Sequence, residues 1–573
     1  MSDDNRPDNT TLANLLFEFA DRLEAKDIEY KPAAYRRAAE NVAEYPGSVA
    51  ALAADGPEAV MEIDRVGEAI ADKLVEYVET GSIEELEALR GELPVEMDAL
   101  TAVEGVGPKT VATLYRELEV QTLADLERVA RNGEIRDLRG FGQTSEQNIL
   151  ENIAFARQSD ARELLGDTRP VADELLATME AHDAVKACEL AGSIRRWRPT
   201  VGDIDVLVAT ADAAAVVEAF VAEGDELIEA GESKASIRLD GVQADLRVVT
   251  PEEYGAALQY FTGSKEHNVQ LRNYALERDV SLNEYGAFEL TDADETGQRI
   301  AGDTEASMYE VLDLAWIPPE LREGTGEIAA AEAGALPDLV RTDDIRGDLH
   351  VHTDWSDGTA SIREMATAAA AFGHEYIAIT DHTDGPGVVG EMGLSAAELR
   401  EQHTAVEAVD AELDIDLLTG VETNIAADGG VSMDDGVLAA CDVVVASPHS
   451  GLSGDGTERL CTAIEHPAVD IIGHPSGRLL NQRSGIEFDP TVVGEAAAAA
   501  GTALEVNSNP LRLDLWGEAI KAAIDAGAEI VIDTDAHRPN SFEHIEYGVH
   551  TARRGWAEAA DVRNTDGVES LRS

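Results

Sequence analysis

Basic residues are scarce in this chain. It carries 44 lysines and arginines against 113 aspartates and glutamates, a formal net charge of −69 over 573 residues. Only eight of the basic residues are lysines. Such a balance ordinarily argues against a nucleic-acid partner. Acidity spread along the whole chain is typical of a halophile, in which surface charge keeps proteins in solution in strong salt, so we expect a cytoplasmic protein of a halophilic archaeon.

Cysteines and long apolar runs are also few. The three cysteines, Cys188, Cys441 and Cys461, form no Cys-x-x-Cys pair, as expected for buried thiols in a reducing compartment. Neither a signal peptide nor an apolar run of about 18 residues occurs, so we expect a soluble protein without a membrane partner. An acidic tail or disordered segment is the competing source of the charge, but 44% hydrophobic residues without low-complexity runs disfavour it.

Two aspartates one residue apart follow a glycine-serine turn. Asp203 and Asp205 stand in the run Val-Gly-Asp-Ile-Asp-Val-Leu, and the dipeptide Gly192-Ser193 precedes them across a short basic turn. On a strand, this spacing puts both carboxylates on one face, where they can hold one or two divalent cations. The turn offers backbone N–H groups and a hydroxyl to phosphate. The pattern predicts a nucleotidyltransferase palm; a half-exposed strand that arose by chance is the alternative.

A third carboxylate strengthens this prediction. Asp245 lies in a second strand pattern, Val-Gln-Ala-Asp-Leu-Arg-Val-Val, and Tyr-Phe-Thr-Gly-Ser follows at residues 260–264. Three carboxylates on neighbouring strands are what two-metal phosphoryl transfer requires, because two bridge the metals and the third helps to deprotonate an attacking 3′ hydroxyl.

These motifs, in this order, resemble those of the family X DNA polymerases, the group that contains polymerase beta. The resemblance implies Mg²⁺ or Mn²⁺ at the three aspartates. It implies that the triphosphate of the incoming nucleotide is held by Gly192, Ser193 and Arg196. Tyr260 and Phe261 would lie under its sugar, and Gly263, also a nucleotide contact, would carry a non-proline cis bond to Ser264. Gln243 departs from the family pattern, since polymerase beta has an arginine beside the third aspartate.

Residues 1–160 are expected to form helices joined by short glycine turns. Residues 12–26 and 35–45 have helical periodicity. Three glycine turns resemble helix-hairpin-helix motifs, in which the N–H groups of the second helix reach a DNA phosphate. Simple helix caps are the alternative for each turn taken alone. The first turn departs from the pattern, with Arg65 where a glycine is usual. The DNA-binding residues that this resemblance implies are Gly67, Gly105, Gly107, Lys109, Gly140 and Gly142.

The first of these helical regions resembles the lyase domain of polymerase beta, in which a lysine attacks the sugar left by base excision. On that alignment Lys73 is the Schiff-base nucleophile, and Lys31 and Tyr35 lie nearby at the DNA. The alternative is that Lys73 only contacts the 5′ phosphate of a gap. A lysine nucleophile must be partly neutral, which needs desolvation or neighbouring cations. Asp72 and Glu76 flank Lys73 instead.

Histidines are concentrated after position 340, where 11 of the 13 occur. In that region short apolar strands alternate with alanine-rich helices, and the strands end in potential metal ligands. Ligands at the C-terminal ends of successive parallel strands converge on one mouth of a barrel. A single histidine usually has a core or surface role, but six histidines and three carboxylates at repeated strand ends are hard to explain that way. The nine residues are His350, His352, Asp357, His382, Glu422, His449, His474, Asp535 and His537.

This set resembles the polymerase and histidinol phosphatase (PHP) domain, a distorted seven-stranded barrel that holds three metals. The resemblance divides the ligands: His350, His352, Glu422 and Asp535 for one ion, Glu422 as a bridge to a second ion with His449 and His474, and Asp357, His382 and His537 for the third. Imidazole and carboxylate ligands suit zinc or manganese, and a bridged cluster lowers the pKa of a bound water so that it can attack phosphorus. Arg478 and Arg483 are candidate phosphate contacts, with solvated surface charge as the alternative.

We therefore expect a multidomain fold: all-α helix-hairpin-helix N-terminal domains, an α+β nucleotidyltransferase palm and a C-terminal distorted (βα)7 PHP barrel. The chain is too long for one core. The expected boundaries are a lyase-like domain at 1–90, a helix-hairpin-helix subdomain at 91–160, the palm at 161–255, a nucleotide-selection subdomain at 256–322, a linker at 323–343 and the PHP domain at 344–573.

The resemblance also implies a function. It indicates a monomeric DNA polymerase that uses deoxynucleoside triphosphates to fill short gaps in gapped or nicked duplex DNA during base excision repair. The barrel would trim 3′ ends as a 3′-5′ exonuclease or a 3′-end phosphoesterase. Two alternatives remain: a catalytically silent barrel that is only a metal-stabilised scaffold, and a protein that is mainly a DNA-end binding factor.

Overall fold

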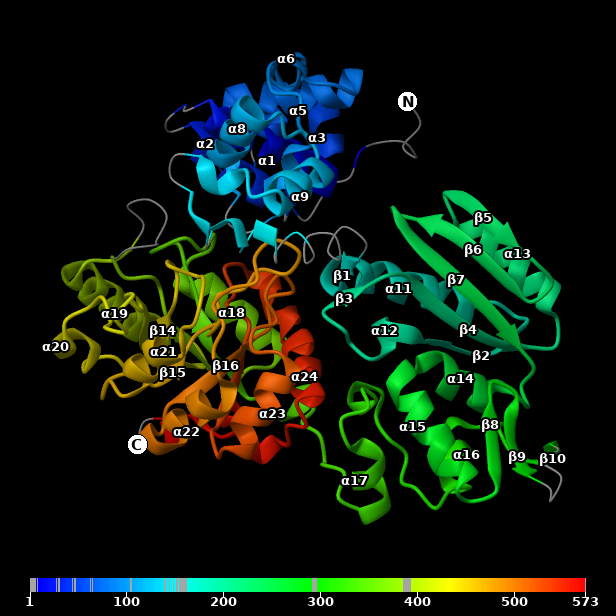
Figure 1. Ribbon diagram of the computed structural model, residues 1–573. Coiled ribbons are helices and arrows are strands. Elements are labelled where there is room, and N and C mark those ends of the chain that lie inside the picture. Colours follow the sequence, from blue (N-terminus) through cyan, green and yellow to red (C-terminus); the bar gives the residue numbers. More distant parts are fainter. Residues whose placement is uncertain are drawn as a thin grey trace. The chain divides into compact units, whose positions relative to one another are not determined.

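The computed structural model describes residues 162–290, 296–384 and 393–571, and most of residues 7–153 (Figure 1). The undescribed positions within 7–153 are 8, 27, 29, 30, 44, 46, 47, 62, 64, 102, 104, 105, 139, 140, 144, 148, 151 and 152. Two compact units divide the chain: Met1–Ala161 with Asn481–Arg483, and Arg162–Leu480 with Ser484–Ser573. Within the described ranges, we find no helix with both the length and the apolar character that a membrane span needs.

The first unit is helical, as the sequence predicts. One apolar cluster includes Leu12, Leu16 and Phe19, which recur on one face of the first helix, and the Phe19 ring stacks on Tyr35 of the second at 4.6 Å between centroids. A second cluster joins Ala25 to apolar residues from Val95 onward. The helices are α1 (Asn9–Ala25), α2 (Lys31–Ala43), α3 (Val49–Asp55), α4 (Pro57–Val60), α5 (Glu68–Thr80), α6 (Glu84–Glu92), α7 (Met97–Thr101), α8 (Pro108–Leu118) and α9 (Leu123–Arg131).

The second unit begins with a five-stranded sheet, ordered β2-β4-β7-β6-β5. Helices α11 (Leu165–Glu180) and α13 (Ala213–Glu223) accompany it, and the one-turn helix α12 (Gly192–Arg195) connects β2 toward β4. The strands β4 and β7 run parallel, while the other neighbours are antiparallel. The strands are β2 (Val185–Leu190), β4 (Ile204–Thr210), β5 (Glu226–Ala230), β6 (Lys234–Leu239) and β7 (Val242–Val249).

A smaller α+β region follows, with an antiparallel sheet ordered β10-β9-β8. The peptide bond between Gly263 and Ser264 is cis, as the resemblance implies. Part of the expected linker is the helix α17 (Glu327–Ala333), whose Ile328 and Ala331 belong to the apolar cluster of this region. The connection to the barrel is therefore a packed one. The other elements are α14 (Tyr254–Thr262), α15 (Lys265–Leu276), β8 (Val280–Asn283), β9 (Gly286–Leu290), β10 (Thr296–Ala301), α16 (Glu305–Glu310) and η3 (Pro319–Leu321).

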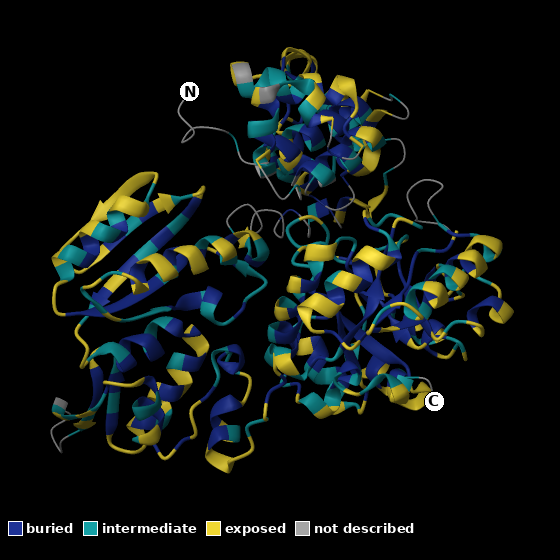
Figure 2. Ribbon diagram, turned by 180° about the vertical axis from the view of Figure 1, so that it is seen from behind, coloured by how far each residue is buried: buried dark blue, intermediate teal, exposed yellow. Residues whose placement is uncertain are grey.

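The C-terminal region is a parallel sheet of seven strands in sequential order. A parallel bridge between Val351 at the end of the first strand and Ala536 just after the last curves the sheet into a nearly closed barrel. Its strands are buried, while the surrounding helices expose one face (Figure 2). The strands are β11 (Gly347–Val351), β12 (Tyr376–Ile379), β13 (Asp416–Asn424), β14 (Val443–Ser447), β15 (Ile471–Ile472), β16 (Ala503–Asn507) and β17 (Ile530–Asp533). The helices are α18 (Ile362–Phe372), α19 (Ala396–Asp410), α20 (Asp435–Leu438), α21 (Thr457–Ile464), α22 (Pro490–Ala500), α23 (Gly517–Asp525), α24 (Ile545–Arg554) and α25 (Val568–Leu571).

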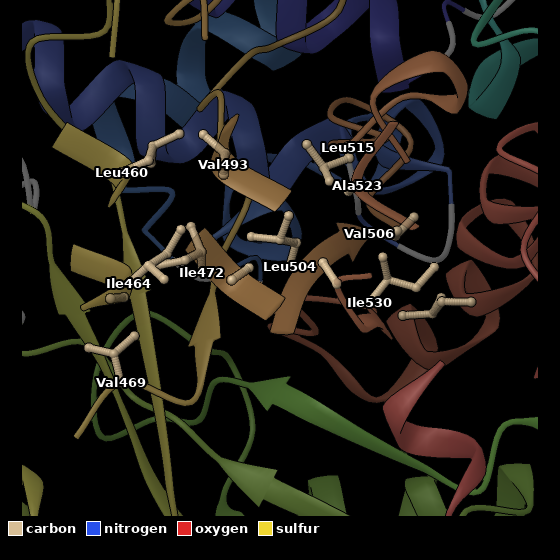
Figure 3. Packing of buried hydrophobic residues seen from close by; sticks show 14 of the residues in the cluster. Leu460, Ile464, Val469, Ile472, Val493, Leu504, Val506, Leu515, Ala523 and Ile530 are labelled. Carbon is tan, nitrogen blue, oxygen red and sulfur yellow. The ribbon is translucent and has the colours of Figure 1, made fainter. Parts of the chain in front are cut away.

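Apolar packing between the strands and the outer helices holds the barrel together. Figure 3 shows Ile472, Leu504 and Ile530 of three strands against Leu460, Val493 and other helical side chains. This is the distorted (βα)7 architecture that the sequence predicts, with the carboxyl ends of all strands at one mouth.

Candidate functional site

The three predicted aspartates of the palm lie together. Asp205 of β4 stands directly opposite Asp245 of β7 in the parallel register, and Asp203 lies just before β4. One oxygen from each carboxylate falls within 4.8 Å of the others. Burial, and then the charges of Asp203 and Asp245, raise the pKa of Asp205 to about 7. Carboxylate oxygens are the ligands that hard divalent cations prefer, so this donor set fits Mg²⁺ or Mn²⁺ chemically.

Gly192 is required where it stands. Its φ of +58° is unfavourable for other residues, and a Cβ there would overlap Oδ2 of Asp205. The glycine therefore lets the Gly-Ser turn lie directly against the carboxylates. Gln243, which departs from the family pattern, donates Nε2 to both oxygens of Asp245 at 3.2 and 3.1 Å.

The two arginines of the turn have different surroundings. Arg195 forms a double ion pair with Glu305 of α16, at 2.7 and 3.0 Å, so its guanidinium is fully engaged in the fold. Arg196 donates Nη1 to the carbonyl of Thr262, and its Nε lies 3.2 Å from Oε1 of Glu323. The contacts of Arg196 with described residues use Nε and Nη1, which leaves Nη2 for a phosphate.

A cavity of about 160 Å³ opens beside the carboxylates. Asp205, Asp245 and Phe261 line it, so the structure brings these predicted residues to one space. Tyr260 and Phe261 end α14, with their rings edge to face at 5.2 Å. Sequence reasoning missed two basic residues that also line the cavity, Lys234 and Arg247. Lys234 pairs with Glu229 at 2.8 Å, and the Arg247 guanidinium lies 5.1 Å from the Phe261 ring centroid.

In the barrel, Glu422 is the centre of the predicted ligand set. Its two oxygens lie between 2.6 and 3.6 Å from a ring nitrogen of five histidines. Those five histidines are His350, His352, His382, His449 and His474.

Asp357 and Asp535 complete the cluster. Asp357 lies 3.3 Å from ring nitrogens of both His382 and His537, and 3.5 Å from one of His352. Asp535 lies 3.3 Å from His352 and 3.6 Å from both His350 and His537. The structure thus brings all nine predicted residues to the mouth of the barrel, and His352 faces two of the expected ion positions rather than one.

Orphaned polar atoms test whether metal ions suit this cluster. Among described residues, both oxygens of Glu422, both ring nitrogens of His352 and Nε2 of His350 are buried without a hydrogen-bond partner. Buried polar atoms seldom lack a partner, so atoms gathered in this way need a cation between them. The cluster therefore fits several divalent ions with imidazole and carboxylate ligands.

Sequence reasoning missed residues that orient the ligands. Glu505 of β16 accepts from Nδ1 of His350 at 2.6 Å, and Asn424 bonds Nδ1 of His449 at 2.7 Å. Such contacts fix the ring and leave the other nitrogen for a metal. The signal for Glu505 was present: it is a carboxylate inside the otherwise apolar strand pattern Ala-Leu-Glu-Val-Asn.

Sequence reasoning also missed Arg512, whose Nε lies 3.6 Å from Oδ2 of Asp535. Arg478, one of the candidate phosphate contacts, instead donates its guanidinium to the backbone carbonyls of Arg512 and Leu513. It therefore fixes the loop that presents Arg512.

In the N-terminal unit, Lys73 lies on α5 near aromatic rings. Its Nζ is 3.0 Å from Oε2 of Glu85, 5.3 Å from the Phe19 centroid and 5.9 Å from that of Tyr35. Burial lowers the pKa of Lys73, but hydrogen bonds to Glu85 and Tyr35 and their charges outweigh burial, so the pKa lies above its ordinary value. The structure thus brings Tyr35 to Lys73, while Lys31 is exposed at the start of α2.

The glycine turns leave room for an outside partner. Gly67 and Gly107 precede α5 and α8 with φ of −82° and −72°, and a Cβ on either, or on Gly142, would meet no atom within 4 Å. The fold itself therefore does not demand glycine at these positions, whereas a phosphate approaching the helix N-terminus would. Lys109 lies in the first turn of α8. Gly105 and Gly140 lie outside the described residues.

Four family models match this chain. The DNA polymerase beta thumb matches residues 257–323, and the PHP domain matches residues 348–486. A helix-hairpin-helix domain matches residues 7–83, and a SAM-like helix-hairpin-helix tandem matches residues 97–154. Asp535 and His537 lie beyond the matched PHP segment, and it is the barrel geometry that joins them to the other ligands.

Curated relatives extend the similarity to nearly the whole chain. It is 35% identical over 570 residues to the DNA polymerase/3'-5' exonuclease PolX of Bacillus subtilis (strain 168), a match that covers 98% of each protein. DNA polymerase lambda of Rattus norvegicus is 23% identical over 288 residues, 46% of this chain and 48% of the relative. A probable phosphatase of Thermoanaerobacter sp. (strain X514) is 30% identical over 234 residues, 38% of this chain and 90% of the relative. This chain therefore belongs to the family X DNA polymerases that carry a C-terminal PHP domain.

Proposed function

We propose that this protein fills short gaps in DNA during base excision repair and trims 3′ ends with its barrel. The observation that best supports gap filling is that oxygens of three carboxylates lie within 4.8 Å of one another, beside the Gly-Ser turn and the cavity. Whole-length similarity to a DNA polymerase/3'-5' exonuclease supports both halves. The substrates are then deoxynucleoside triphosphates and gapped or nicked duplex DNA, and we expect the chain to act as a monomer in the cytoplasm.

In the palm, we assign Asp203, Asp205 and Asp245 as ligands of Mg²⁺ or Mn²⁺, which would neutralise the triphosphate and activate the primer hydroxyl. Ser193 and the free edge of Arg196 hold the triphosphate. Because burial, and then the charges of Asp203 and Asp245, raise the pKa of Asp205 to about 7, this carboxylate can hold a proton near neutrality until a cation binds.

In the barrel, we assign the nine clustered residues as ligands of three zinc or manganese ions, which would supply an activated water for attack on phosphorus. Glu505 and Asn424 hold His350 and His449 in the orientation that ligation needs. Arg512, at 3.6 Å from Asp535, is placed to receive a substrate phosphate oxygen. These roles support 3′-5′ exonuclease chemistry.

Removal of a 3′-terminal phosphate is a second candidate activity of the barrel. It needs the same activated water and the same phosphate contact, and it differs only in the leaving group. One relative that is matched over 90% of its length carries the name of a probable phosphatase.

For the N-terminal domain, we propose that Lys73 meets the 5′ phosphate of a gap as a cation. The ion pair with Glu85 raises its pKa and opposes the neutral amine that Schiff-base chemistry requires. Lyase activity would need the DNA to displace Glu85 first. Gly67, Gly107 and Gly142, with Lys109, would bind the duplex backbone beside it.

A one-nucleotide gapped duplex tests the proposal. The full chain is incubated in molar KCl with deoxynucleoside triphosphates and Mg²⁺ or Mn²⁺, and extended and shortened primers are resolved together. We expect extension by one nucleotide when nucleotide is present and shortening when it is withheld. A second substrate with a 3′ phosphate separates the two barrel activities. A chain that binds the duplex without changing either primer would be a DNA-end binding factor instead.

A further inference from the structure

Side chains of the barrel helix α24 contact the turn that follows Gly192-Ser193 in the palm, within one compact unit. Trp197, which follows the two arginines of the turn, is buried at 6% exposure. Its ring stacks on His550 at 3.7 Å between centroids with an interplanar angle of 4°, and meets Tyr547 edge-on at 5.7 Å. Aromatic contacts of this kind give the turn a fixed support on the barrel.

An ionic contact reaches the turn beside the ring. Glu323 lies 3.0 Å from Nη1 of Arg554, 3.2 Å from Nε of Arg196 and 3.5 Å from Nη1 of Arg198. The same Nη1 of Arg554 donates to the backbone carbonyl of Arg196 at 2.8 Å. The Arg554 side chain is only 7% exposed and that of Glu323 is 18% exposed. Water therefore weakens this network little, and each charge in it affects the others.

Arg554 acts on Arg196 in two ways that work in the same direction. The bond to the carbonyl fixes the backbone from which the Arg196 side chain projects. In addition, Arg554 shares the negative charge of Glu323, which would otherwise be balanced by Arg196 and Arg198 alone. Without Arg554, Glu323 would draw the guanidinium of Arg196 more strongly and leave less of it for a triphosphate.

We propose that Arg554, a residue of the barrel, is a positioning residue for nucleotide binding in the palm. It holds Arg196 so that one edge of that guanidinium stays available to the triphosphate. This inference rests on the proposed role of Arg196 in holding the nucleotide. It gives the barrel a second role, as part of the scaffold of the polymerase site, independent of its own metal cluster.

Arg553 provides a matched control on the same helix. It pairs with Glu320 of η3 at 2.7 Å and donates to the carbonyl of Val340 at 3.1 Å, so it ties α24 to the segments on either side of Glu323 without touching the turn. A general role in anchoring α24 to the polymerase region would make Arg553 and Arg554 equivalent. A positioning role predicts that they differ.

The test compares Arg554→Met with Arg553→Met in the full chain on a one-nucleotide gapped duplex. We expect Arg554→Met to raise KM for the incoming nucleotide roughly fivefold to thirtyfold with kcat near that of the parent. Arg553→Met should change KM less than about twofold. Metal content and 3′ trimming, measured on the same preparations, should match the parent in both variants.

Two further variants complete the design. Glu323→Gln removes the shared charge but not the bond to the Arg196 carbonyl, so adding Arg554→Met in that background should have a smaller effect than in the parent. Arg554→Lys keeps a cation and should raise KM less than Arg554→Met; it replaces Arg554→Met if that variant loses metal and trimming through misfolding. Equal KM values for the two methionine variants, or an unchanged KM in Arg554→Met and Arg554→Lys, would overturn the inference. A parent chain that adds no nucleotide would contradict the proposed function instead.

Discussion

The palm and the barrel gather metal ligands in opposite ways. The palm offers three carboxylates, all partly exposed, in and just before two inner strands of an open sheet, beside a cavity. The barrel offers nine proposed ligands, six imidazoles and three carboxylates. Among these nine, His350, His352 and Glu422 are fully buried. Oxygen ligands in an open position suit ions that arrive with the nucleotide, whereas enclosed imidazole ligands suit ions that stay with the protein. We therefore expect one chain to combine an exchangeable metal site in the palm with a resident one in the barrel.

The largest expected effect comes from the open site. Asp205→Ala should lower nucleotide addition by roughly three or more decades, because a ligand shared by the reacting metals is lost, and should leave 3′ trimming unchanged. Primer extension and primer shortening on the gapped duplex measure the two activities. Glu226→Ala, an exposed carboxylate on β5 of the same sheet, is the control. Equal loss of both activities in Asp205→Ala would mean that the two sites are not separate.

In the barrel, the loss of bound metal should increase with the number of histidines that the removed ligand faces. Glu422 faces five histidines, so Glu422→Ala should empty more of the cluster than His449→Ala, which removes a single contact to Glu422. The metal content of the purified variants measures this difference. The rate of 3′ trimming should fall as metal content falls, while nucleotide addition persists. Full metal and full trimming in both variants would show that the ligand assignment is wrong.

Substituting a residue that orients a proposed ligand should have an intermediate effect on metal binding. Glu505→Gln keeps the shape but removes the charge that holds His350, and it should weaken metal affinity by about tenfold to a hundredfold. Competition with a chromophoric chelator gives the affinity directly. The matched control is Glu375→Gln, an exposed carboxylate on the same barrel. An affinity unchanged in Glu505→Gln would remove Glu505 from the support of the site.

For Lys73 we expect little covalent chemistry. Borohydride trapping on an incised abasic site should give a weak adduct with the parent, because the ion pair with Glu85 keeps the amine protonated. Glu85→Gln should lower the pKa of Lys73 and increase the adduct, and Lys73→Ala should abolish it. A strong adduct in the parent that Glu85→Gln does not change would show that the ion pair does not control this lysine.

The smallest effect is expected at the glycine turns. Gly107→Val adds bulk where a phosphate would approach, and it should weaken binding to gapped duplex by roughly twofold to tenfold in molar KCl. Arg128→Ala, an exposed arginine of α9, should change it less. Because the chain carries a charge of −69, parent binding should persist as salt rises, since screening reduces repulsion from DNA. Fluorescence anisotropy across a KCl series decides both points.

The sequence predicts well which side chains gather at the mouth of the barrel, and it predicts their surroundings poorly. His350, Glu422 and Asp535 each stand in or beside a strand pattern, so local spacing is enough to place them at one mouth. Glu505 lies in a strand too, but its role depends on which histidine faces it, and the two residues are 155 positions apart. Long-range pairing of this kind leaves no local pattern.

The expected linker shows the same limit. The alanine- and glycine-rich composition of residues 324–334 favours a linker, yet Glu327 begins α17 and lies within hydrogen-bond distance of the buried His267, 2.7 Å from its Nδ1. That partner is 60 positions away. Likewise, the contact between Arg554 and Glu323 joins residues 231 positions apart, and only the folded chain reveals it.

Retention of metal after chelation tests the contrast between the two sites most directly. The full chain is treated with a chelator, freed of it by gel filtration, and assayed for metal content, trimming without added metal, and nucleotide addition before and after adding Mg²⁺. We predict that barrel ions and trimming are retained, and that addition is lost and then restored by Mg²⁺ alone. Loss of both activities at the same chelator concentration, with both restored by Mg²⁺, would contradict a resident site in the barrel and an exchangeable one in the palm.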